Sequence, residues 1–292
     1  DLNLFVIFLS GNTYSLTVFK ISKILFKFNF TLYFTILVLS ICSISMALAE
    51  APEEKGLRLA IEGDLTGQGF KDTLSKSEMT LRNAQGEESI RTFSSKTLEM
   101  ENDGDKSIFI FHHPKDVAGT AILTFTHKSG PDDQWLYLPA LKRVKRISSD
   151  NKSGAFVGSE FAYEDLSSQE VEKYTYKWIE DVPCPGDEQE MCYVSESYPE
   201  DKSSGYTKRV SWVDISEHRA RKIDYYDRKD KLLKTLILSD YKQYLGKFWN
   251  AHSLKMVNHN TNKETDIVIS ETVFQTGLKD SDFNRQTLKR AR

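Results

Sequence analysis

The sequence lacks the short motifs that mark the commonest enzyme active sites. It contains no G-x-S-x-G nucleophile turn, no glycine-rich phosphate-binding loop and no H-E-x-x-H zinc motif. Nor do its six histidines show the spacing of metal ligands: His112, His113, His127, His218, His252 and His259. We therefore predict a protein that is not an enzyme and has no metal or cofactor. A hydrolase assembled from scattered Ser, His and Asp residues is the alternative left open.

An excess of positive charge is also missing. The 292-residue chain carries 39 Lys and Arg against 42 Asp and Glu, a net charge of −3. General binding to nucleic acid needs a net basic surface that neutralises phosphates, so this composition argues against it. The chain is 39% hydrophobic and 28% charged, which is ordinary for a globular protein and enough for one large domain or two small ones.

Cysteine is scarce, with three in the chain: Cys42, Cys184 and Cys192. The last two flank Pro185 and Gly186, and in an oxidising compartment such a pair predicts a short disulfide loop. Zinc binding is the alternative for this pair. Two thiols with no histidine in the loop do not complete a tetrahedral zinc site, so the disulfide is favoured.

Residues 1–49 differ in kind from the rest of the chain. Three lysines precede an apolar run over residues 30–44, and the tripeptide Ala47-Leu48-Ala49 follows. A positive region, an apolar region and a small-residue A-x-A site are the three parts of a secretory signal. We therefore predict a signal peptide over residues 1–49, with a possible upstream extension, cleavage after Ala49 and export to the periplasm. Its removal lowers the net charge from −3 to −5, because three lysines and one aspartate leave.

Two other interpretations of this leader stay open. A membrane-spanning helix needs about 20 apolar residues, and the apolar run is close to that length. A lipoprotein signal would use Leu39-Ser40-Ile41-Cys42 as its attachment box and anchor the protein through Cys42. Ile41 is bulkier than the small residue usual before that cysteine, which argues against the lipid anchor.

Beyond residue 50 the pattern is mainly that of β-strands. From about residue 72, polar turn clusters such as residues 102–105 (Asn-Asp-Gly-Asp) recur every 8 to 14 residues, which is typical of an antiparallel meander. Some runs, such as residues 108–111 (Ile-Phe-Ile-Phe), are apolar on both faces. Both faces of such strands must be covered by a second layer, by helices or by an apolar ligand.

We predict one mainly β domain over residues 50–292. About ten or eleven strands would form one strongly curved antiparallel sheet, a half-open β-barrel, because a flat sheet of that many strands is unusual. Short lid helices are expected near Glu53 to Leu65, where apolar residues recur at helical spacing, and near Asp280 to Lys289. No internal repeat or low-complexity linker divides this region.

One block of the chain is more specific than the rest. It reads W-L-Y-L-P at residues 135–139, R-V-K-R-I at residues 143–147 and G-A-F-V-G-S-E-F-A-Y-E-D-L at residues 154–166, with Gly119-Thr120 opening the strand before it. This block resembles the LolA-like family of outer-membrane lipoprotein-sorting proteins. The resemblance extends from about residue 55 to residue 290, but only this block carries specific motifs.

The resemblance implies a periplasmic carrier with a half-open β-barrel whose apolar concave face, covered by lid helices, shelters acyl chains. It also implies lipid or lipoprotein cargo, an inner-membrane transporter of the RND type and an outer-membrane acceptor. The chain is longer than the better-known lipoprotein carrier of this family and has the Cys184 and Cys192 pair. The identity of the cargo therefore stays open.

Six aromatic residues are candidates for acyl binding in the cavity or on a flap that covers it: Phe125, Trp135, Tyr137, Phe156, Phe161 and Tyr163. The last three belong to a loop in which Gly154 and Gly158 can act as hinges, and a movable apolar flap would admit lipid to a closed cavity. The alternative is that these aromatics simply plug the end of the barrel.

Four basic residues follow the aromatic strand: Lys142, Arg143, Lys145 and Arg146. As a functional patch they would meet anionic lipid headgroups or an acidic transporter surface, each charge adding about 1 kcal/mol of attraction. As a solvated edge strand they would instead prevent unwanted strand pairing through their charge. The sequence leaves both roles open.

Two functions from different classes follow for a protein that is not an enzyme. The first is a soluble carrier that binds acyl chains by apolar transfer, at about 0.8 kcal/mol per buried methylene, and moves them passively toward the outer membrane. The second is an envelope scaffold or a membrane-anchored lipoprotein with a filled core.

Overall fold

The computed structural model describes residues 3–10, 13–20 and 50–290. The helices within these ranges are all too short or too polar to cross a membrane. Two compact units divide the chain, residues 1–50 and residues 51–292. The cleavage site predicted after Ala49 and the alternative anchor at Cys42 lie outside the described residues.

The first unit contains an antiparallel hairpin of two strands, β1 (Asn3–Ser10) and β2 (Thr13–Lys20). The second unit contains thirteen strands: β3 (Asp72–Arg82), β4 (Glu88–Leu98), β5 (Lys106–His113), β6 (Ala121–Phe125), β7 (Asp133–Leu138), β8 (Arg143–Ile147), β9 (Tyr174–Cys184), β10 (Asp187–Pro199), β11 (Tyr206–Asp214), β12 (Ala220–Asp227), β13 (Leu232–Tyr244), β14 (Phe248–Asn258) and β15 (Lys263–Phe274).

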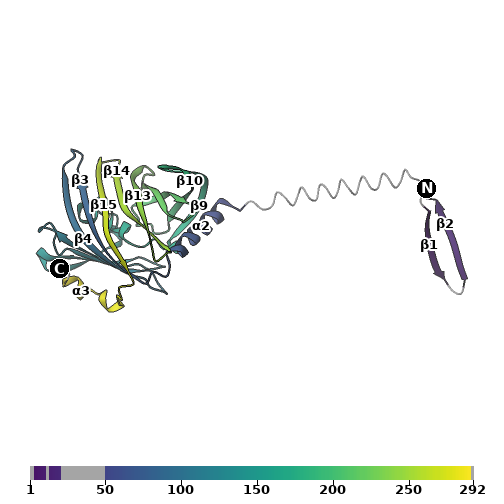
Figure 1. Ribbon diagram of the computed structural model, residues 1–292, viewed down its shortest axis with the longest axis horizontal. Helices are drawn as coiled ribbons and strands as arrows, with labels where there is room; N and C mark the ends of the chain where they lie inside the picture. The colour runs from purple at the N-terminus through teal and green to yellow at the C-terminus, as the bar shows by residue number, and fades with distance from the viewer. Residues whose placement is uncertain (1–2, 11–12, 21–49, 291–292) are drawn as a thin grey trace. The chain divides into compact units, whose positions relative to one another are not determined.

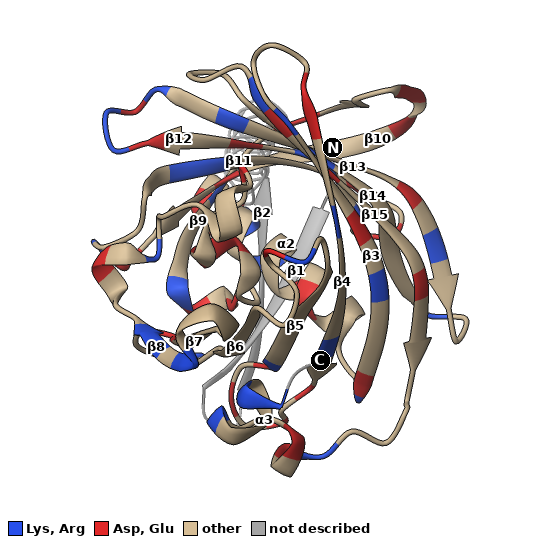
Figure 2. Ribbon diagram, turned by 90° about the vertical axis from the view of Figure 1, so that its left-hand side faces the viewer, with Lys and Arg blue, Asp and Glu red and all other residues tan. Residues whose placement is uncertain are grey.

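These thirteen strands form one antiparallel sheet in the order β8-β7-β6-β5-β4-β3-β15-β14-β13-β12-β11-β10-β9. Figure 1 shows its central strands β3, β15, β14 and β13 side by side. The chain starts at the centre of the sheet with β3 and meanders to one edge at β8. It then crosses to the other edge at β9 and meanders back until β15 pairs with β3. Strands β8 and β9 are both edges, so the sheet curves without closing (Figure 2).

The predicted fold class, a strongly curved antiparallel sheet, is confirmed, but the number of strands is higher than the predicted ten or eleven. Strand β8 illustrates the difference, because three of its five residues are Lys or Arg and all three are exposed. An edge strand with one partner does not need the apolar alternation from which strands are recognised.

Helix α2 (Pro52–Gly67) agrees with the first predicted helix. Pro52 is the first residue of the helix, a position where proline is well tolerated. Acidic residues in the first turn stabilise the helix because their negative charge interacts favourably with the positive end of the helix dipole. The helix packs against β9 so closely that a Cβ on Gly56 would lie 2.7 Å from the backbone nitrogen of Trp178. Lys55 places its ammonium group 3.6 Å from the centre of the Trp178 ring.

The second predicted helix corresponds to a short 3-10 turn, η6 (Asp280–Asp282), and helix α3 (Arg285–Lys289). Asn284 caps α3 by accepting hydrogen bonds from the backbone of Gln286 and Thr287. Leu288 is fully buried against one face of the sheet.

The two faces of the sheet carry separate apolar clusters. One cluster contains side chains from strands in both halves of the sheet: Met79, Phe93, Phe111, Ile122, Tyr206, Tyr225, Leu236, Met256 and Ile267, together with Phe156 and Phe161 from the connection between β8 and β9. Strands so far apart can contact the same connection only if the sheet curves toward it. This face is therefore the concave face.

The other cluster lies on the convex face and is smaller. It joins β5 and β6 to the C-terminal segment: Ile108, Ile110, Ala121, Leu123, Phe283 and Leu288. Helix α3 thus covers the convex face, whereas a lid was expected over the concave one. The run of apolar residues 108–111 is explained by this arrangement, because its alternate side chains enter the two clusters.

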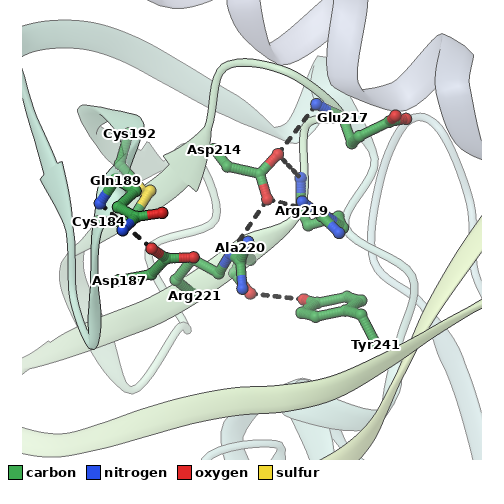
Figure 3. Close-up of a disulfide and its surroundings, with 10 residues drawn as sticks. All are labelled: Cys184, Asp187, Gln189, Cys192, Asp214, Glu217, Arg219, Ala220, Arg221 and Tyr241. Carbon is green, nitrogen blue, oxygen red and sulfur yellow. Dashed lines mark hydrogen bonds and ion pairs between the residues drawn. A yellow bond between two sulfur atoms is a disulfide. The ribbon is translucent and has the colours of Figure 1, made fainter.

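Cys184 and Cys192 form the predicted disulfide at the turn between β9 and β10 (Figure 3). Both cysteines are buried, and the bond closes a loop with a sequence separation of 8. On the neighbouring strand, fully buried Asp214 accepts hydrogen bonds from Nε of Arg219 at 2.7 Å and Nε of Arg221 at 3.0 Å (Figure 3). The disulfide and this ion-pair cluster tie together the same end of β9, β10 and β11.

Replacing both cysteines by alanine should lower the free energy of unfolding by about 2.5 kcal/mol, because the short loop would be unconstrained in the unfolded chain. Urea unfolding of the oxidised wild-type protein and of the double variant measures this difference. Wild-type protein in reducing buffer is the matched control and should agree with the variant. Equal stability of the oxidised and reduced proteins would show that the disulfide does not stabilise the fold.

Candidate functional site

The connection between β8 and β9, residues 148–173, fills much of the concave face. We call it the inserted segment. It has no long regular element and consists of four 3-10 turns: η2 (Ser149–Asn151), η3 (Phe156–Gly158), η4 (Tyr163–Leu166) and η5 (Val171–Lys173). Because β8 and β9 are opposite edges of the sheet, this connection has to span the open side of the curved sheet.

Aromatic side chains of the inserted segment enter the concave cluster. Phe156 is 1% exposed, and its ring centre lies 5.5 Å from that of Phe111 and 5.9 Å from that of Tyr163. Phe161 is 5% exposed in the same cluster. In this structure Phe156 and Phe161 therefore cover apolar side chains of the sheet, as expected if the loop aromatics plug the end of the barrel.

A buried ion pair fastens the inserted segment to the sheet. Lys234 of β13 places Nζ 2.6 Å from Oδ2 of Asp165, and both side chains are almost completely buried. The same lysine donates a hydrogen bond to the carbonyl oxygen of Glu160 at 3.0 Å, and Tyr206 donates its hydroxyl to Asp165 at 2.9 Å. Because removal of one partner would leave the other charge buried and unpaired, this pair fixes where the segment sits.

More polar contacts surround this ion pair. Glu160 accepts a hydrogen bond from Nδ2 of Asn258 at 2.6 Å, and its backbone nitrogen donates to the hydroxyl of Thr265 at 3.0 Å. Glu164 accepts hydrogen bonds from Ser204 and from the backbone nitrogen of Gly205, each at 2.8 Å. The segment is thus held by hydrogen bonds and an ion pair around its two buried phenylalanines.

The tip of the inserted segment is strained. Val157 has a φ of 47° and a ψ of 37°, a left-handed conformation that is unfavourable for a β-branched residue. Arg91 of β4 donates a hydrogen bond to the carbonyl oxygen of Val157 and helps to hold it there. Gly158, with a φ of 78°, follows directly and takes a conformation that glycine accepts without cost. Backbone strain of this kind persists only where the surroundings enforce it.

The inserted segment leaves part of the concave face incompletely covered. Leu238, Leu254 and Ile269 pack against the concave cluster but are only partly buried. These three residues lie on β13, β14 and β15, three neighbouring strands near the middle of the sheet. They form an incompletely covered apolar part of the concave face.

A cavity of about 720 Å³ lies beside the inserted segment. Its walls come from the connection before β7, from both ends of the inserted segment and from the connection between β10 and β11. Ion pairs border it, between Lys152 and Asp201 and between Lys173 and Asp132. The volume is in the range of pockets that hold small organic ligands.

The structure separates the six predicted acyl-binding aromatics into two groups. Phe125, Trp135 and Tyr137 do not line the concave face with the loop aromatics. They pack on the convex face beside α3, where the ring centre of Trp135 lies 5.1 Å from that of Phe125 and 5.8 Å from the guanidinium of Arg285. Alternation along β7 showed that Trp135 and Tyr137 share a face, but alternation does not show which face is concave. Acyl binding by any of the six stays a prediction.

The four predicted basic residues lie at the edge of the sheet. Lys142 precedes β8, and Arg143, Lys145 and Arg146 lie on it, all with exposed side chains. The ribbon around β8 is accordingly largely blue in Figure 2. Arg146 forms an ion pair with Asp133 of the neighbouring strand. Their position agrees with the edge-strand interpretation, and a role in contacts with headgroups or partners stays a prediction.

Two carboxyl groups meet where the inserted segment approaches the connection between β4 and β5. Burial raises the pKa of Asp105 to about 6. Burial, reinforced by the nearby charge of Asp105, raises the pKa of Glu170 to about 7. A Cβ on Gly104 would lie 2.8 Å from Oε1 of Glu170, so the glycine leaves room for this carboxyl group. Across residues 50–290, no group of three or more His, Cys, Asp or Glu is placed to hold a metal ion.

These raised pKa values predict that the protein is less stable at neutral pH than at mildly acidic pH. Between about pH 4 and pH 7 the folded protein keeps protons on Asp105 and Glu170 that the unfolded chain releases, so the free energy of unfolding falls as pH rises. Glu170→Gln should therefore raise the free energy of unfolding at about pH 8 by about 1–2 kcal/mol, a value reduced for the partial exposure of Glu170, and leave it unchanged at about pH 4.

Urea unfolding at the two pH values measures this effect. The exposed neighbour Glu172 provides the matched control, because Glu172→Gln should change stability little at either pH. His127 also has a raised pKa, but it does not affect the comparison of the Glu170 and Glu172 variants. Burial lowers its pKa, but hydrogen bonds to Asp103 and Asp133 raise it more, and this contribution is equal in both variants. An equal effect of Glu170→Gln at both pH values would contradict the raised pKa of Glu170.

A family model described as an uncharacterized protein matches residues 103–290. No match was found among curated proteins. One similar structure is a domain from Vibrio parahaemolyticus that is named an outer membrane lipoprotein-sorting protein domain. It is 53% identical to this chain in sequence, with a TM-score of 0.79, and the match covers 82% of this chain and 100% of that chain.

Two more distant structures share the architecture. A DUF1329 family protein from Desulfovibrio piger is 28% identical with a TM-score of 0.76, and a LolA superfamily protein from Nitrosomonas europaea is 20% identical with a TM-score of 0.64. Each covers 82% of this chain and 100% of the other chain, and the second shows the fold alone. The curved open sheet is the fold of that LolA superfamily protein, and with the 53% identity the chain belongs to the family of outer-membrane lipoprotein-sorting proteins.

Proposed function

We propose that this protein is a periplasmic carrier that shelters the acyl chains of a lipid or lipoprotein against the concave face of its sheet and moves them toward the outer membrane. One observation carries the proposal. The apolar cluster on the concave face is covered by Phe156 and Phe161 of the irregular inserted segment, and among the described residues no side chain of helix α2 belongs to that cluster. Irregular segments held by polar contacts open at lower free-energy cost than packed layers do.

An acyl chain can replace the apolar contacts that the inserted segment makes. Withdrawal of Phe156 and Phe161 from the concave cluster would cost about 1.5–3 kcal/mol for each side chain. An acyl chain with about a dozen methylenes gains about 10 kcal/mol on leaving water. Separation of the buried pair of Asp165 and Lys234 would cost about 3–5 kcal/mol more, so the exchange is close to balanced with one acyl chain and favourable with two. No chemical step is required of the protein.

The compartment and partners belong to the same proposal. We place the mature protein in the periplasm after cleavage behind Ala49, with a lipid anchor at Cys42 as the alternative. The disulfide between Cys184 and Cys192 supports an oxidising compartment. Cargo would come from an inner-membrane transporter of the RND type and pass to an outer-membrane acceptor. The exposed basic residues of β8 would then face anionic headgroups or the transporter.

One observation favours a second candidate, an envelope scaffold with a filled core. Phe156 and Phe161 are almost completely buried and fill the concave face as core residues do. In that case the inserted segment would stay in place permanently. Native mass spectrometry of protein purified from the envelope separates the candidates, because a carrier retains lipid and a scaffold shows the mass of the polypeptide alone.

Two neighbouring residues of β13 provide a matched test of the carrier. Leu238 packs against the concave cluster, whereas Ile237 is 44% exposed on the other face. Leu238→Gln should weaken binding of a pyrene-labelled diacylglycerol about tenfold, because a polar group would lie on the acyl-binding surface. Ile237→Gln should leave the affinity unchanged. Fluorescence titration measures both, and circular dichroism confirms that both variants fold. Equal affinities for the two variants would contradict acyl binding on the concave face.

A further inference from the structure

A buried arginine beside the inserted segment lacks a carboxylate partner. Arg209 of β11 is 6% exposed, and among the described residues no carboxylate oxygen lies within 4.0 Å of its nitrogens. Its guanidinium donates to Oε1 of Gln169 and to the hydroxyl of Tyr174, each at 2.9 Å, and both partners are neutral. A buried cation without a counter-charge is costly and marks a position that an anion can occupy favourably.

The surroundings do not supply the missing negative charge. The guanidinium carbon lies 5.6 Å from the ring of Tyr206 and 5.5 Å from the ring of Tyr225. Burial raises the pKa of both tyrosines above the usual range, so both phenols stay neutral. The nearby carboxylate of Asp165 is already paired with Lys234. Two buried cations therefore face one buried carboxylate on this part of the concave face.

Two polar atoms at this position have no hydrogen-bond partner among the described residues: Nε of Arg209 and the hydroxyl oxygen of Ser197. Ser197 of β10 is 5% exposed and is the direct cross-strand partner of Arg209, so the two side chains share one face of the sheet. A guanidinium N–H and a neighbouring hydroxyl are both donors to a phosphate or carboxylate oxygen.

One of the two hydrogen-bond partners of Arg209 lies at the surface. Gln169, which accepts one of the two hydrogen bonds, belongs to the inserted segment and is exposed. Tyr174, which accepts the other, also lines the cavity of about 720 Å³ beside the segment. Displacement of the Gln169 side chain would therefore open Arg209 to a group that lies in this cavity.

We propose that Arg209, with Ser197, binds the phosphate of an anionic lipid carried by this protein, and that Gln169 covers the site when it is empty. This inference rests on the proposed carrier function and extends it from acyl chains to a headgroup. The acyl chains would lie on the apolar part of the concave face. The phosphate would displace Gln169 and supply the missing charge next to Arg209, so the site would prefer anionic lipids to uncharged ones.

Competition between two lipids with identical acyl chains tests the proposal. Phosphatidylglycerol should displace pyrene-labelled diacylglycerol from the full-length mature protein about tenfold more effectively than unlabelled diacylglycerol does, as one charge-assisted contact implies. Arg209→Met should abolish this preference and keep diacylglycerol binding. Lys208→Gln, which removes a charge from the opposite face of the same strand, is the matched control and should keep the preference.

A second variant covers the case in which Arg209→Met does not fold. Gln169→Glu places a carboxylate on the exposed covering residue, where it would pair with Arg209. It should abolish the preference for phosphatidylglycerol, leave diacylglycerol binding unchanged and raise the melting temperature. Gln169→Ala, the uncharged control at the same position, should keep or increase the preference.

The outcomes separate this inference from the carrier function. Equal displacement by both lipids, or a preference that survives in Arg209→Met or Gln169→Glu, would overturn the phosphate site and leave the carrier function standing. Binding of neither lipid by the wild-type protein would overturn both. Inorganic phosphate alone should not compete with phosphatidylglycerol at equal concentration. Competition by it would assign the site to free phosphate and overturn the lipid assignment.

Discussion

The contact between the inserted segment and the concave face is the interaction on which the rest of the structure depends. A curved sheet with one apolar concave face must cover that face or expose it to water. Here the chain leaves one edge of the sheet at β8, lays Phe156 and Phe161 into the concave cluster, and resumes at the opposite edge with β9. The buried pair of Asp165 and Lys234 fixes this placement. The same contact protects the apolar face from water and, in the proposed carrier, would control when a ligand reaches it.

The charges on the concave side are not fully paired around the inserted segment. Near Glu170 the structure has excess negative charge, and burial keeps its carboxyl group protonated to a higher pH than usual. Near Arg209 it has excess positive charge covered by the neutral side chain of Gln169. Both imbalances involve the C-terminal part of the segment, and each makes the closed arrangement less stable than full pairing would. For the proposed carrier, such incomplete pairing would lower the free-energy cost of opening the segment.

Much of the fold could be predicted from the sequence, because alternation along strands and the spacing of turns are local signals. The short helices, the disulfide and the curvature followed from such signals and from the number of strands. The face on which Trp135 lies could not be predicted, because alternation is symmetric until one face is known to be concave. The pairing of Asp165 with Lys234 and the isolation of Arg209 were also hidden, because these contacts join residues far apart in the chain.

Hydrogen exchange in the inserted segment tests the central claim most directly. The backbone amides of residues 156–166 should exchange slowly in the empty protein and faster when a diacylglycerol is bound, because the acyl chains displace the segment. The hairpin closed by Cys184 and Cys192 should show the same protection in both states and serves as the internal reference. Unchanged protection of residues 156–166 with lipid bound would contradict the claim that the segment gives up its place on the concave face to the cargo.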